Sequence, residues 1–213
     1  MMPPSDDFVR ARHNMVRRQI KGRGIRDKNV LAAMERIERH QFVSSELWKL
    51  AYQDRPLSIE YGQTISQPYI VALMTELLEL NGESKALEIG TGCGYQTAVL
   101  AELANEVYSV EILPELAEIA KKRLETLNYH NIKLKQGNGY FGWIEHAPYD
   151  GVLVTAAPEK IPFRLTQQLN DGGRMVIPVG SNTQELLLIE KRSGKVDTKY
   201  ITGVSFVPMT GPS

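Results

Sequence analysis

The chain has 213 residues, a length typical of one α/β domain with a short appendage, and its 25 basic residues balance 25 acidic ones. The zero net charge gives no bulk attraction to nucleic acid, and no apolar run reaches the length of a membrane span. The single cysteine, Cys93, excludes an intramolecular disulfide and a cysteine cluster for zinc, which suits a reducing compartment. We expect a cytoplasmic monomer that binds no metal, nucleic acid or membrane.

Residues before about Asn81 show helical spacing and predict an appendage that precedes a sheet. Asp27 is placed to cap one helix, and Ser44 or Ser45 to cap another that contains Trp48 and Tyr52. The first of these helices has an apolar stripe of Val30, Leu31, Met34 and Ile37. A local basic cluster of Arg17, Arg18, Lys21 and Arg23 is interpreted as a solvated helix face.

Residues 54–68 are polar and contain one glycine and two prolines, which predicts a loop or a short hairpin. Pro68 suits the first turn of an apolar helix over residues 69–80, and Asn81 with Gly82 supplies a stop. Ser66 or Gln67 therefore lies at the amino end of this helix. From the pattern alone, Ser66 is a helix cap.

The stretch Ala-Leu-Glu-Ile-Gly-Thr-Gly-Cys-Gly at residues 86–94 predicts a buried strand that ends in a glycine loop. A helix over residues 98–104 follows, so the loop lies at the crevice where open α/β sheets bind ligands. Gly90, Gly92 and Gly94 form G-x-G-x-G, whereas a dinucleotide fingerprint needs its third glycine at the position that Tyr95 occupies. A pyrophosphate site is therefore the weaker interpretation.

A second strand over residues 107–110 is followed by Glu111, whose carboxylate is placed to accept hydrogen bonds from both hydroxyls of a ribose. Strand, glycine loop, helix, strand and terminal acid together resemble the S-adenosylmethionine site of a Rossmann-like class I methyltransferase. Cys93 fits the loop as a small side chain, since no partner base for a nucleophile is evident.

The rest of the chain continues the α/β alternation. We predict helices over residues 114–127 and 162–169, and strands over residues 132–135, 152–157, 174–179, 186–190 and 200–207. The connection at Ser193–Gly194 is too short for a helical crossover, so the last strands form an antiparallel edge. We therefore expect a single α/β domain over residues 1–213: a helical lid and substrate loop (1–81) and a Rossmann-like core (82–213) with a mostly parallel sheet flanked by helices.

Over nearly its full length the sequence resembles the protein-L-isoaspartate O-methyltransferases. The most specific element is Gly-Gln-Thr-Ile-Ser-Gln-Pro at residues 62–68, which general methyltransferases do not carry. Further matches are residues 87–96, Ala-Pro-Tyr-Asp at 147–150, and Gly-Gly-Arg at 172–174 leading to Pro-Val-Gly at 178–180.

This resemblance implies transfer of a methyl group from S-adenosyl-L-methionine to the free α-carboxylate of L-isoaspartyl residues in damaged proteins and peptides, leaving S-adenosyl-L-homocysteine. The methyl ester re-forms a succinimide, which can hydrolyse to normal aspartate. A carboxylate with a pKa of about 3.5 to 4 is already ionised and needs no general base. The four histidines (His13, His40, His130 and His146) therefore need no catalytic role and are expected at the surface.

By residue, the resemblance implies that Ser66 is the active-site serine that orients the carboxylate. Ile65 and Val207 would contact substrate. The residues expected to hold the cofactor are Gln63, Thr64, Ile65, Ser66, Glu88, Gly90, Gly92, Gly94, Glu111, Asn138, Gly139 and Thr210. At Asn138 the family usually has aspartate, and a neutral hydrogen bond contributes about 1 kcal/mol against roughly 1.5 to 3 for a charged one, so we expect weaker cofactor binding.

Three alternatives stay open from the sequence. A methyltransferase with a different carboxylate acceptor explains residues 90–111 equally well but leaves residues 64–68 unexplained. A non-catalytic module that binds S-adenosylmethionine is slightly favoured by Asn138. A nicotinamide oxidoreductase is disfavoured by Tyr95.

Overall fold

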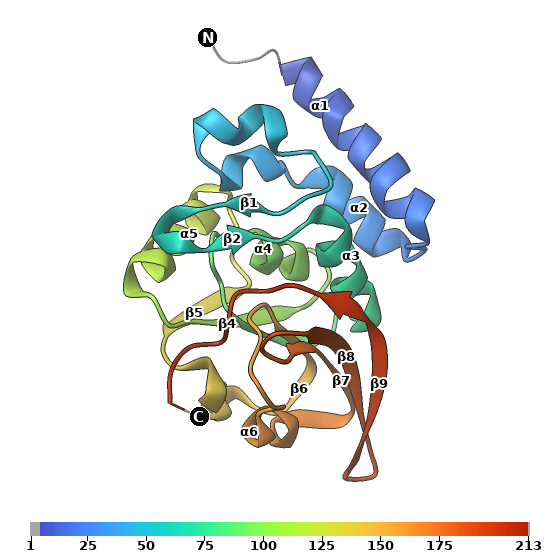
Figure 1. Ribbon diagram of the computed structural model, residues 1–213, viewed down its shortest axis with the longest axis vertical. Helices are drawn as coiled ribbons and strands as arrows, with labels where there is room; N and C mark the ends of the chain where they lie inside the picture. Colours follow the sequence, from blue (N-terminus) through green and yellow to red (C-terminus); the bar gives the residue numbers. More distant parts are fainter. Residues whose placement is uncertain (1–4, 213) are drawn as a thin grey trace.

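The computed structural model describes residues 5–212, which form a central seven-stranded sheet with helices on both faces (Figure 1). The strand order is β5-β4-β3-β6-β7-β8-β9; the first five strands are parallel, and β8 and β9 run antiparallel. The predicted fold class and antiparallel edge are thus confirmed. The strands span Lys85–Ile89 (β3), Glu106–Glu111 (β4), Ile132–Gln136 (β5), Tyr149–Val154 (β6), Leu169–Val179 (β7), Gln184–Arg192 (β8) and Lys195–Val204 (β9).

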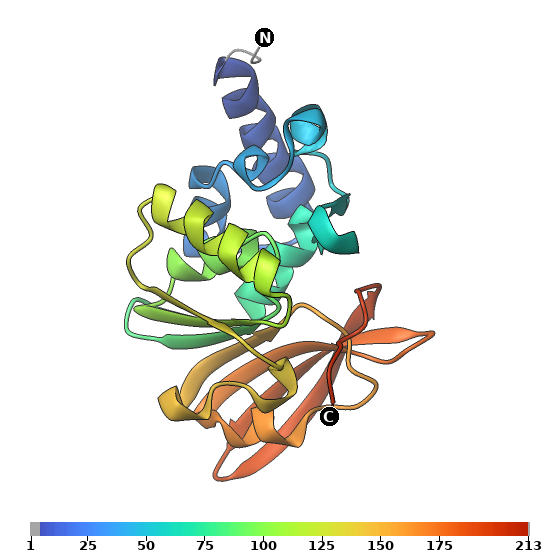
Figure 2. The same cartoon turned by 90° about the vertical axis from the view of Figure 1, so that its left-hand side faces the viewer.

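Helices α3 (Pro68–Leu77), α4 (Tyr95–Ala101) and α5 (Pro114–Thr126) cover one face of the sheet, and α6 (Phe163–Gln167) covers the other (Figures 1 and 2). Because side chains alternate along a strand, β3 contributes to both cores. Ala86 packs in the core on the α4 side, whereas Leu87 and Ile89 pack in the core that contains Leu165 of α6. Burial on both faces explains the continuous apolar runs of the parallel strands.

Several helix boundaries differ from the sequence prediction, most clearly those of α3 and α4. Helix α4 begins at Tyr95, directly after Gly94, which has a left-handed φ of 89°. Helix α3 ends at Leu77, three residues before the predicted end at Leu80. Leu80 is buried against Gly151 of β6, where an added Cβ would lie 2.7 Å from Leu80 Cδ2, so packing on the sheet ends the helix early.

The amino-terminal appendage comprises α1 (Ser5–Asn14), a π-helical turn (Met15–Ile20), α2 (Lys28–Arg36) and short 3-10 turns, and it lies at the opposite end of the molecule from β8 and β9 (Figure 2). Asp27 caps α2, since its carboxylate accepts from the backbone N–H groups of Asn29 and Val30 at 2.7 and 2.9 Å. Of the two serines predicted to cap the next helix, Ser44 holds the N-cap position of a 3-10 helix (Ser45–Leu50), but its side chain makes no capping hydrogen bond. The four residues of the basic cluster are exposed, as predicted.

His40 corrects the expectation that all four histidines lie at the surface. It is only 9% exposed, its ring stacks on Phe8 at a centroid distance of 4.0 Å, and its Nδ1 lies 2.8 Å from the hydroxyl of Tyr52. Burial lowers the pKa of His40. The side chain is a neutral member of an aromatic cluster that joins α1 to the rest of the appendage, which the helical pattern alone did not indicate.

Residues 54–68 form the predicted hairpin, with β1 (Leu57–Ser58) paired antiparallel to β2 (Thr64–Ile65). At the other end of the chain, β9 stops at Val204, three residues before the predicted end at Val207. The Gln184 side chain takes the place of a partner strand beyond this point. It accepts from Phe206 N at 2.6 Å and donates to Phe206 O at 3.0 Å, so the chain continues as an extended segment outside the sheet.

Candidate active site

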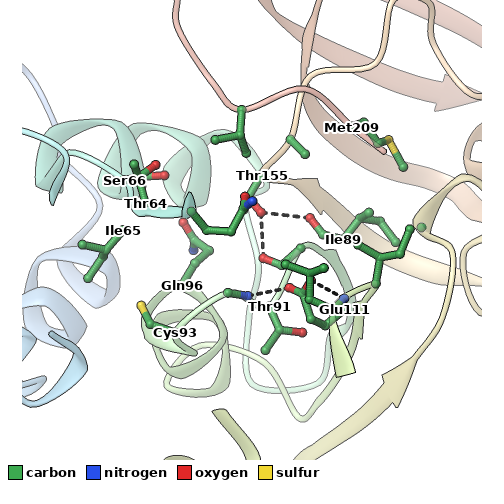
Figure 3. A pocket seen from close by; sticks show the side chains of 18 of the residues that line it. Thr64, Ile65, Ser66, Ile89, Thr91, Cys93, Gln96, Glu111, Thr155 and Met209 are labelled. Carbon is green, nitrogen blue, oxygen red and sulfur yellow. Dashed lines mark hydrogen bonds between the residues drawn. The ribbon is translucent and has the colours of Figure 1, made fainter. Parts of the chain in front are cut away.

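A cavity of about 440 Å³ lies at the carboxyl ends of β3, β4 and β6. The hairpin of β1 and β2 forms one wall, and residues 207–210 form another (Figure 3). Thr64, Ile65 and Ser66 lie on one side of the cavity, while Ile89 and Met209 lie on the other. The predicted site residues that line it are Gln63, Thr64, Ile65, Ser66, Gly90, Gly92, Glu111, Gly139, Val207 and Thr210.

Two glycines shape the floor because no larger residue fits. Gly90 has a φ of 94°, and a Cβ there would lie 2.3 Å from Thr155 Oγ1, which donates to Gly90 O at 2.7 Å. A Cβ on Gly139 would lie 2.2 Å from Ile89 Cγ2. The floor is therefore bare backbone, which lets a ligand approach the ends of the strands closely.

Glu111 stands at the end of β4 with its carboxylate fixed by two backbone donors. Oε2 accepts from Gly92 N at 2.8 Å and Oε1 accepts from Leu113 N at 3.1 Å. The residue is 6% exposed, yet it lines the cavity. A carboxylate oxygen has more than one lone-pair site, so the remaining sites can accept from a ligand's hydroxyls.

Glu88 lies beneath the glycine loop and does not line the cavity. Its Oε2 accepts from the hydroxyls of Thr97 and Ser109, both at 2.6 Å, and Ser109 also contacts Thr91 Oγ1 at 2.6 Å. The side chain is fully buried, and this desolvation raises the pKa of Glu88 to about 8. At neutral pH, Glu88 is therefore a neutral acid that supports the loop from below.

This protonation predicts a pH-dependent effect of Glu88→Gln. Between pH 4.5 and about 8 the unfolded chain has an ionised Glu88 while the folded protein keeps the proton, so the free energy of unfolding falls as pH rises through this window. Each pH unit costs about 1.4 kcal/mol. Glutamine stays neutral throughout, so the variant's stability relative to wild type should rise from pH 5 to pH 8, as measured by urea unfolding. A difference independent of pH would show that Glu88 is ionised in the folded protein.

Ser66 lies between β2 and α3 and lines the cavity. The N-cap of α3 is Gln67, with Pro68 in the first turn and no side-chain capping bond, so the expectation that Ser66 is a helix cap is wrong. Within residues 5–212 the Ser66 hydroxyl has no hydrogen-bond partner of its own. It is therefore free to bind a ligand in the cavity.

Gly94 and Asn138 are predicted site residues that do not line the cavity. Gly94 instead starts α4 in the left-handed conformation. Asn138 uses both ends of its amide within the protein: Oδ1 accepts from Tyr140 N at 3.0 Å, and Nδ2 donates to Pro212 O at 2.7 Å. An aspartate could not make the second bond, so Asn138 holds the end of the 207–212 segment beside β5.

Several lining residues were missed by the sequence prediction, among them Tyr61, Thr91, Gln96, Thr155 and Met209. Thr155 follows the last residue of β6, and its position at a strand's carboxyl end was the signal that could have found it. Met209 reaches the cavity because Met209 N donates to Ala157 O and Ala157 N donates to Val207 O, both at 2.8 Å. Such a long-range pairing leaves no local sequence pattern.

The described residues contain no candidate metal site, and Cys93 lacks the properties of a nucleophile. In residues 5–212 no group of three His, Cys, Asp or Glu side chains could hold a metal ion. Cys93 lines the cavity but is 4% exposed, and burial raises the pKa of its thiol. The thiol stays protonated at neutral pH.

Among the described residues, every helix is too short or too polar to span a bilayer.

Comparison with known proteins identifies the family. Residues 10–213 match the model of the family described as Protein-L-isoaspartate(D-aspartate) O-methyltransferase. The chain belongs to this family. The methyltransferase is 54% identical to the protein-L-isoaspartate O-methyltransferase of Picosynechococcus sp., over all of this chain and 98% of that protein. It is also 53% identical to the protein-L-isoaspartate O-methyltransferase of Dictyoglomus turgidum, over 90% of this chain and 88% of that protein.

Solved structures agree with this assignment. A protein-L-isoaspartate O-methyltransferase superposes on this methyltransferase with a TM-score of 0.86 and 30% identity, over 94% of this chain and 66% of that one. A Plasmodium falciparum structure, titled as a complex of such an enzyme with S-adenosyl-L-homocysteine, matches with a TM-score of 0.80 at 24% identity, over 93% and 98% of the two chains, and supports the fold. The family predicted from residues 62–68 and the glycine loop is confirmed.

Proposed function

We propose that this chain transfers the methyl group of S-adenosyl-L-methionine to the free α-carboxylate of L-isoaspartyl residues in damaged proteins and peptides. The observation that carries this proposal is the placement of the Ser66 hydroxyl, without a partner in the described chain, in the same cavity as Glu111 and the glycine loop. The Ser66 hydroxyl suits an anionic acceptor, and Glu111 with the glycine loop suits a nucleoside. A carboxyl methyltransferase needs both side by side.

The residues of the cavity fit the cofactor. Gly90 and Gly139, where a Cβ would clash with Thr155 and Ile89, leave a floor of bare backbone. Glu111 presents a fixed carboxylate at the end of β4, where a ribose diol binds in such sheets. Gln63, Thr64 and Thr210 complete the walls. When bound, S-adenosylmethionine supplies an electrophilic methyl group on a sulfonium centre. Glu88, Gly94 and Asn138 would act indirectly, by supporting the loop, the start of α4 and the 207–212 segment.

The chain's own task is to position the acceptor. Ser66 donates to one oxygen of the isoaspartyl carboxylate and leaves the other oxygen to attack. Since that carboxylate is ionised at neutral pH, no side chain has to remove a proton. The buried walls, with Ile65 only 3% exposed, displace water from the carboxylate and so raise its reactivity. Orientation and desolvation together account for the catalysis.

The remaining sequence predictions belong to the same proposal. Residues 1–81 act as a lid and substrate loop on a core of residues 82–213, with residues 1–4 and 213 outside the described chain. The enzyme works as a cytoplasmic monomer without nucleic acid. The single buried cysteine suits a reducing compartment, and the balanced charge gives no bulk attraction to nucleic acid.

The test is a methyl-transfer assay with radiolabelled S-adenosylmethionine and paired synthetic peptides that differ only in isoaspartate or aspartate at one position. We expect base-labile label on the isoaspartyl peptide alone. Label on neither peptide, with cofactor binding shown by calorimetry, would instead favour a different acceptor or a non-catalytic binding module.

A further inference from the structure

The chain contains two Asn-Gly pairs, at residues 81–82 and 138–139, and the fold holds them in different ways. Asparagine before glycine is prone to deamidation, because no Cβ on the next residue hinders attack of its backbone nitrogen on the asparagine side chain. Asn81 and Gly82 are both exposed, in the turn between α3 and β3. Asn138 is half-buried and precedes the buried Gly139, which lines the cavity. One chain therefore offers an open pair and an enclosed pair.

The turn at Asn81 leaves the reacting groups free. Gly82 N donates to no group within residues 5–212, so it is available as the attacking nitrogen. Asn81 Oδ1 accepts from Glu83 N at 2.9 Å, which polarises the side-chain carbonyl, while Nδ2 has no partner in the same range. A Cβ added to Gly82 would meet no atom within 4 Å, so the turn has room to move. Attack and release of ammonia are both unhindered here.

Asn138 lacks this freedom. Its Oδ1 accepts from Tyr140 N at 3.0 Å, and its Nδ2 donates to Pro212 O at 2.7 Å. Gly139 packs so closely that an added Cβ would lie 2.2 Å from Ile89 Cγ2. To reach Gly139 N, the Asn138 side chain would have to break both hydrogen bonds. This requirement should slow its deamidation by about 5- to 150-fold relative to an unrestrained pair.

We propose that Asn81 deamidates in the folded protein and that the isoaspartate formed there is a substrate for a second molecule of the same chain. Gly82 N attacks Asn81 Cγ, the Cγ–Nδ2 bond breaks, and ammonia leaves with the proton from Gly82 N. Water then opens the succinimide at either carbonyl and gives aspartate or isoaspartate at position 81. The isoaspartate carries a free α-carboxylate on an exposed turn, which is the acceptor of the proposed function.

The methylation rests on the proposed function and has to be intermolecular. Asn81 precedes the amino end of β3, whereas the cavity lies at the carboxyl end of this five-residue strand, about 15 Å further on. Position 81 therefore cannot reach Ser66 of its own chain. Isoaspartate also inserts a main-chain carbon into a turn closed by Ser84 N donating to Asn81 O at 2.9 Å. The loosened turn can then enter the cavity of another molecule.

The transfer in that second molecule is the established type of step. The carboxylate of residue 81 forms the O–CH₃ bond, the S–CH₃ bond of S-adenosylmethionine breaks, and S-adenosylhomocysteine leaves. Gly82 N then displaces methanol and re-forms the succinimide. Repeated rounds convert isoaspartate to aspartate, so the protein maintains its own turn at residues 81–84.

The first experiment measures deamidation without cofactor. Wild-type protein is aged in mildly alkaline buffer, and the proteolytic peptides that contain each Asn-Gly pair are followed by mass spectrometry. Deamidation at Asn81 should exceed that at Asn138 by about 5- to 150-fold. Gly82→Ala should suppress it at Asn81, because the added Cβ hinders attack yet fits the open turn. Equal rates at the two pairs, or an unchanged rate in Gly82→Ala, would overturn the proposal.

The second experiment separates acceptor from enzyme. Aged Ser66→Ala protein, which keeps the Asn-Gly turn but loses the catalytic hydroxyl, is mixed with radiolabelled S-adenosylmethionine and fresh Gly82→Ala protein as enzyme. Label should appear on the peptide that contains residue 81, at a rate proportional to the enzyme concentration, and aged Gly82→Ala acceptor should take up little there. Isoaspartate at residue 81 that stays unlabelled, while a synthetic isoaspartyl peptide is methylated, would overturn the proposal. A synthetic peptide that is not methylated either would instead show that the proposed function fails.

Discussion

Ser66→Ala should lower kcat for an isoaspartyl peptide by about 10- to 1000-fold, the range expected for loss of one positioned hydrogen-bond donor. The hydroxyl caps no helix and has no partner in residues 5–212, so its removal takes away an interaction with substrate and no contact within the protein. The affinity for S-adenosylmethionine, measured by calorimetry, should stay within about 2-fold. The midpoint of thermal unfolding should not change, because an unpaired partly exposed hydroxyl contributes little stability.

Two further variants sharpen this test. Ser66→Thr keeps the donor and should retain more activity than the alanine variant. Ser58→Ala removes a hydroxyl from the exposed part of β1, outside the cavity, and should react as wild type does. Wild-type turnover in Ser66→Ala would remove the hydroxyl from the mechanism and leave the backbone around it as the carboxylate site.

Glu111→Ala should weaken binding of S-adenosylmethionine about 10- to 150-fold, measured as Kd by calorimetry. The figure takes the net loss at the ribose as about that of one hydrogen bond to a charged group, 1.5–3 kcal/mol, because water replaces part of the lost contacts. The substitution also frees Gly92 N and Leu113 N, which now fix the rim of the cavity through the carboxylate. Glu111→Gln should weaken cofactor binding nearly as much, because its amide nitrogen would face one of these N–H groups.

Glu106→Ala is the matched control for Glu111. Glu106 begins the same strand, and its partly exposed carboxylate pairs with Lys133 at 2.9 Å, at the end of β4 away from the cavity. Its loss should leave the Kd unchanged. An unchanged Kd in Glu111→Ala would mean that the ribose lies elsewhere and that the carboxylate only supports the loop.

The parts of the fold that the sequence predicted well are those with strong local causes. The strand at residues 85–89 follows from a dense apolar run that breaks into glycines, and the cap at Asp27 follows from a polar residue before an apolar stripe. Helix α3 ended early because Leu80 packs against Gly151, a partner 71 positions away that no local pattern reveals. His40 was misplaced because its aromatic neighbours come from two separate segments, Phe8 from α1 and Trp48 and Tyr52 from the segment that follows His40.

The site shows the same division. Residues at the ends of predicted strands, such as Gly90 and Glu111, were found because parallel strands bring their carboxyl ends to one edge. Glu88 was predicted to bind the cofactor, yet its side chain lies on the α4 face below the cavity, which the alternation along β3 decides. Tyr61 and Met209 reach the cavity through a hairpin and a crossing segment, and their placement depends on contacts across the whole chain.

The way the cavity is assembled has a consequence for how the molecule folds. It is lined by residues 61, 63–66, 71, 89–93, 95–96, 110–113, 139, 155–156 and 207–210, which come from widely separated parts of the chain. Closing such long loops is entropically costly and comes late in folding, after the local helices have formed. We therefore expect cofactor binding to appear only with the final cooperative step of refolding. The cofactor would then stabilise the folded sheet without taking part in its formation.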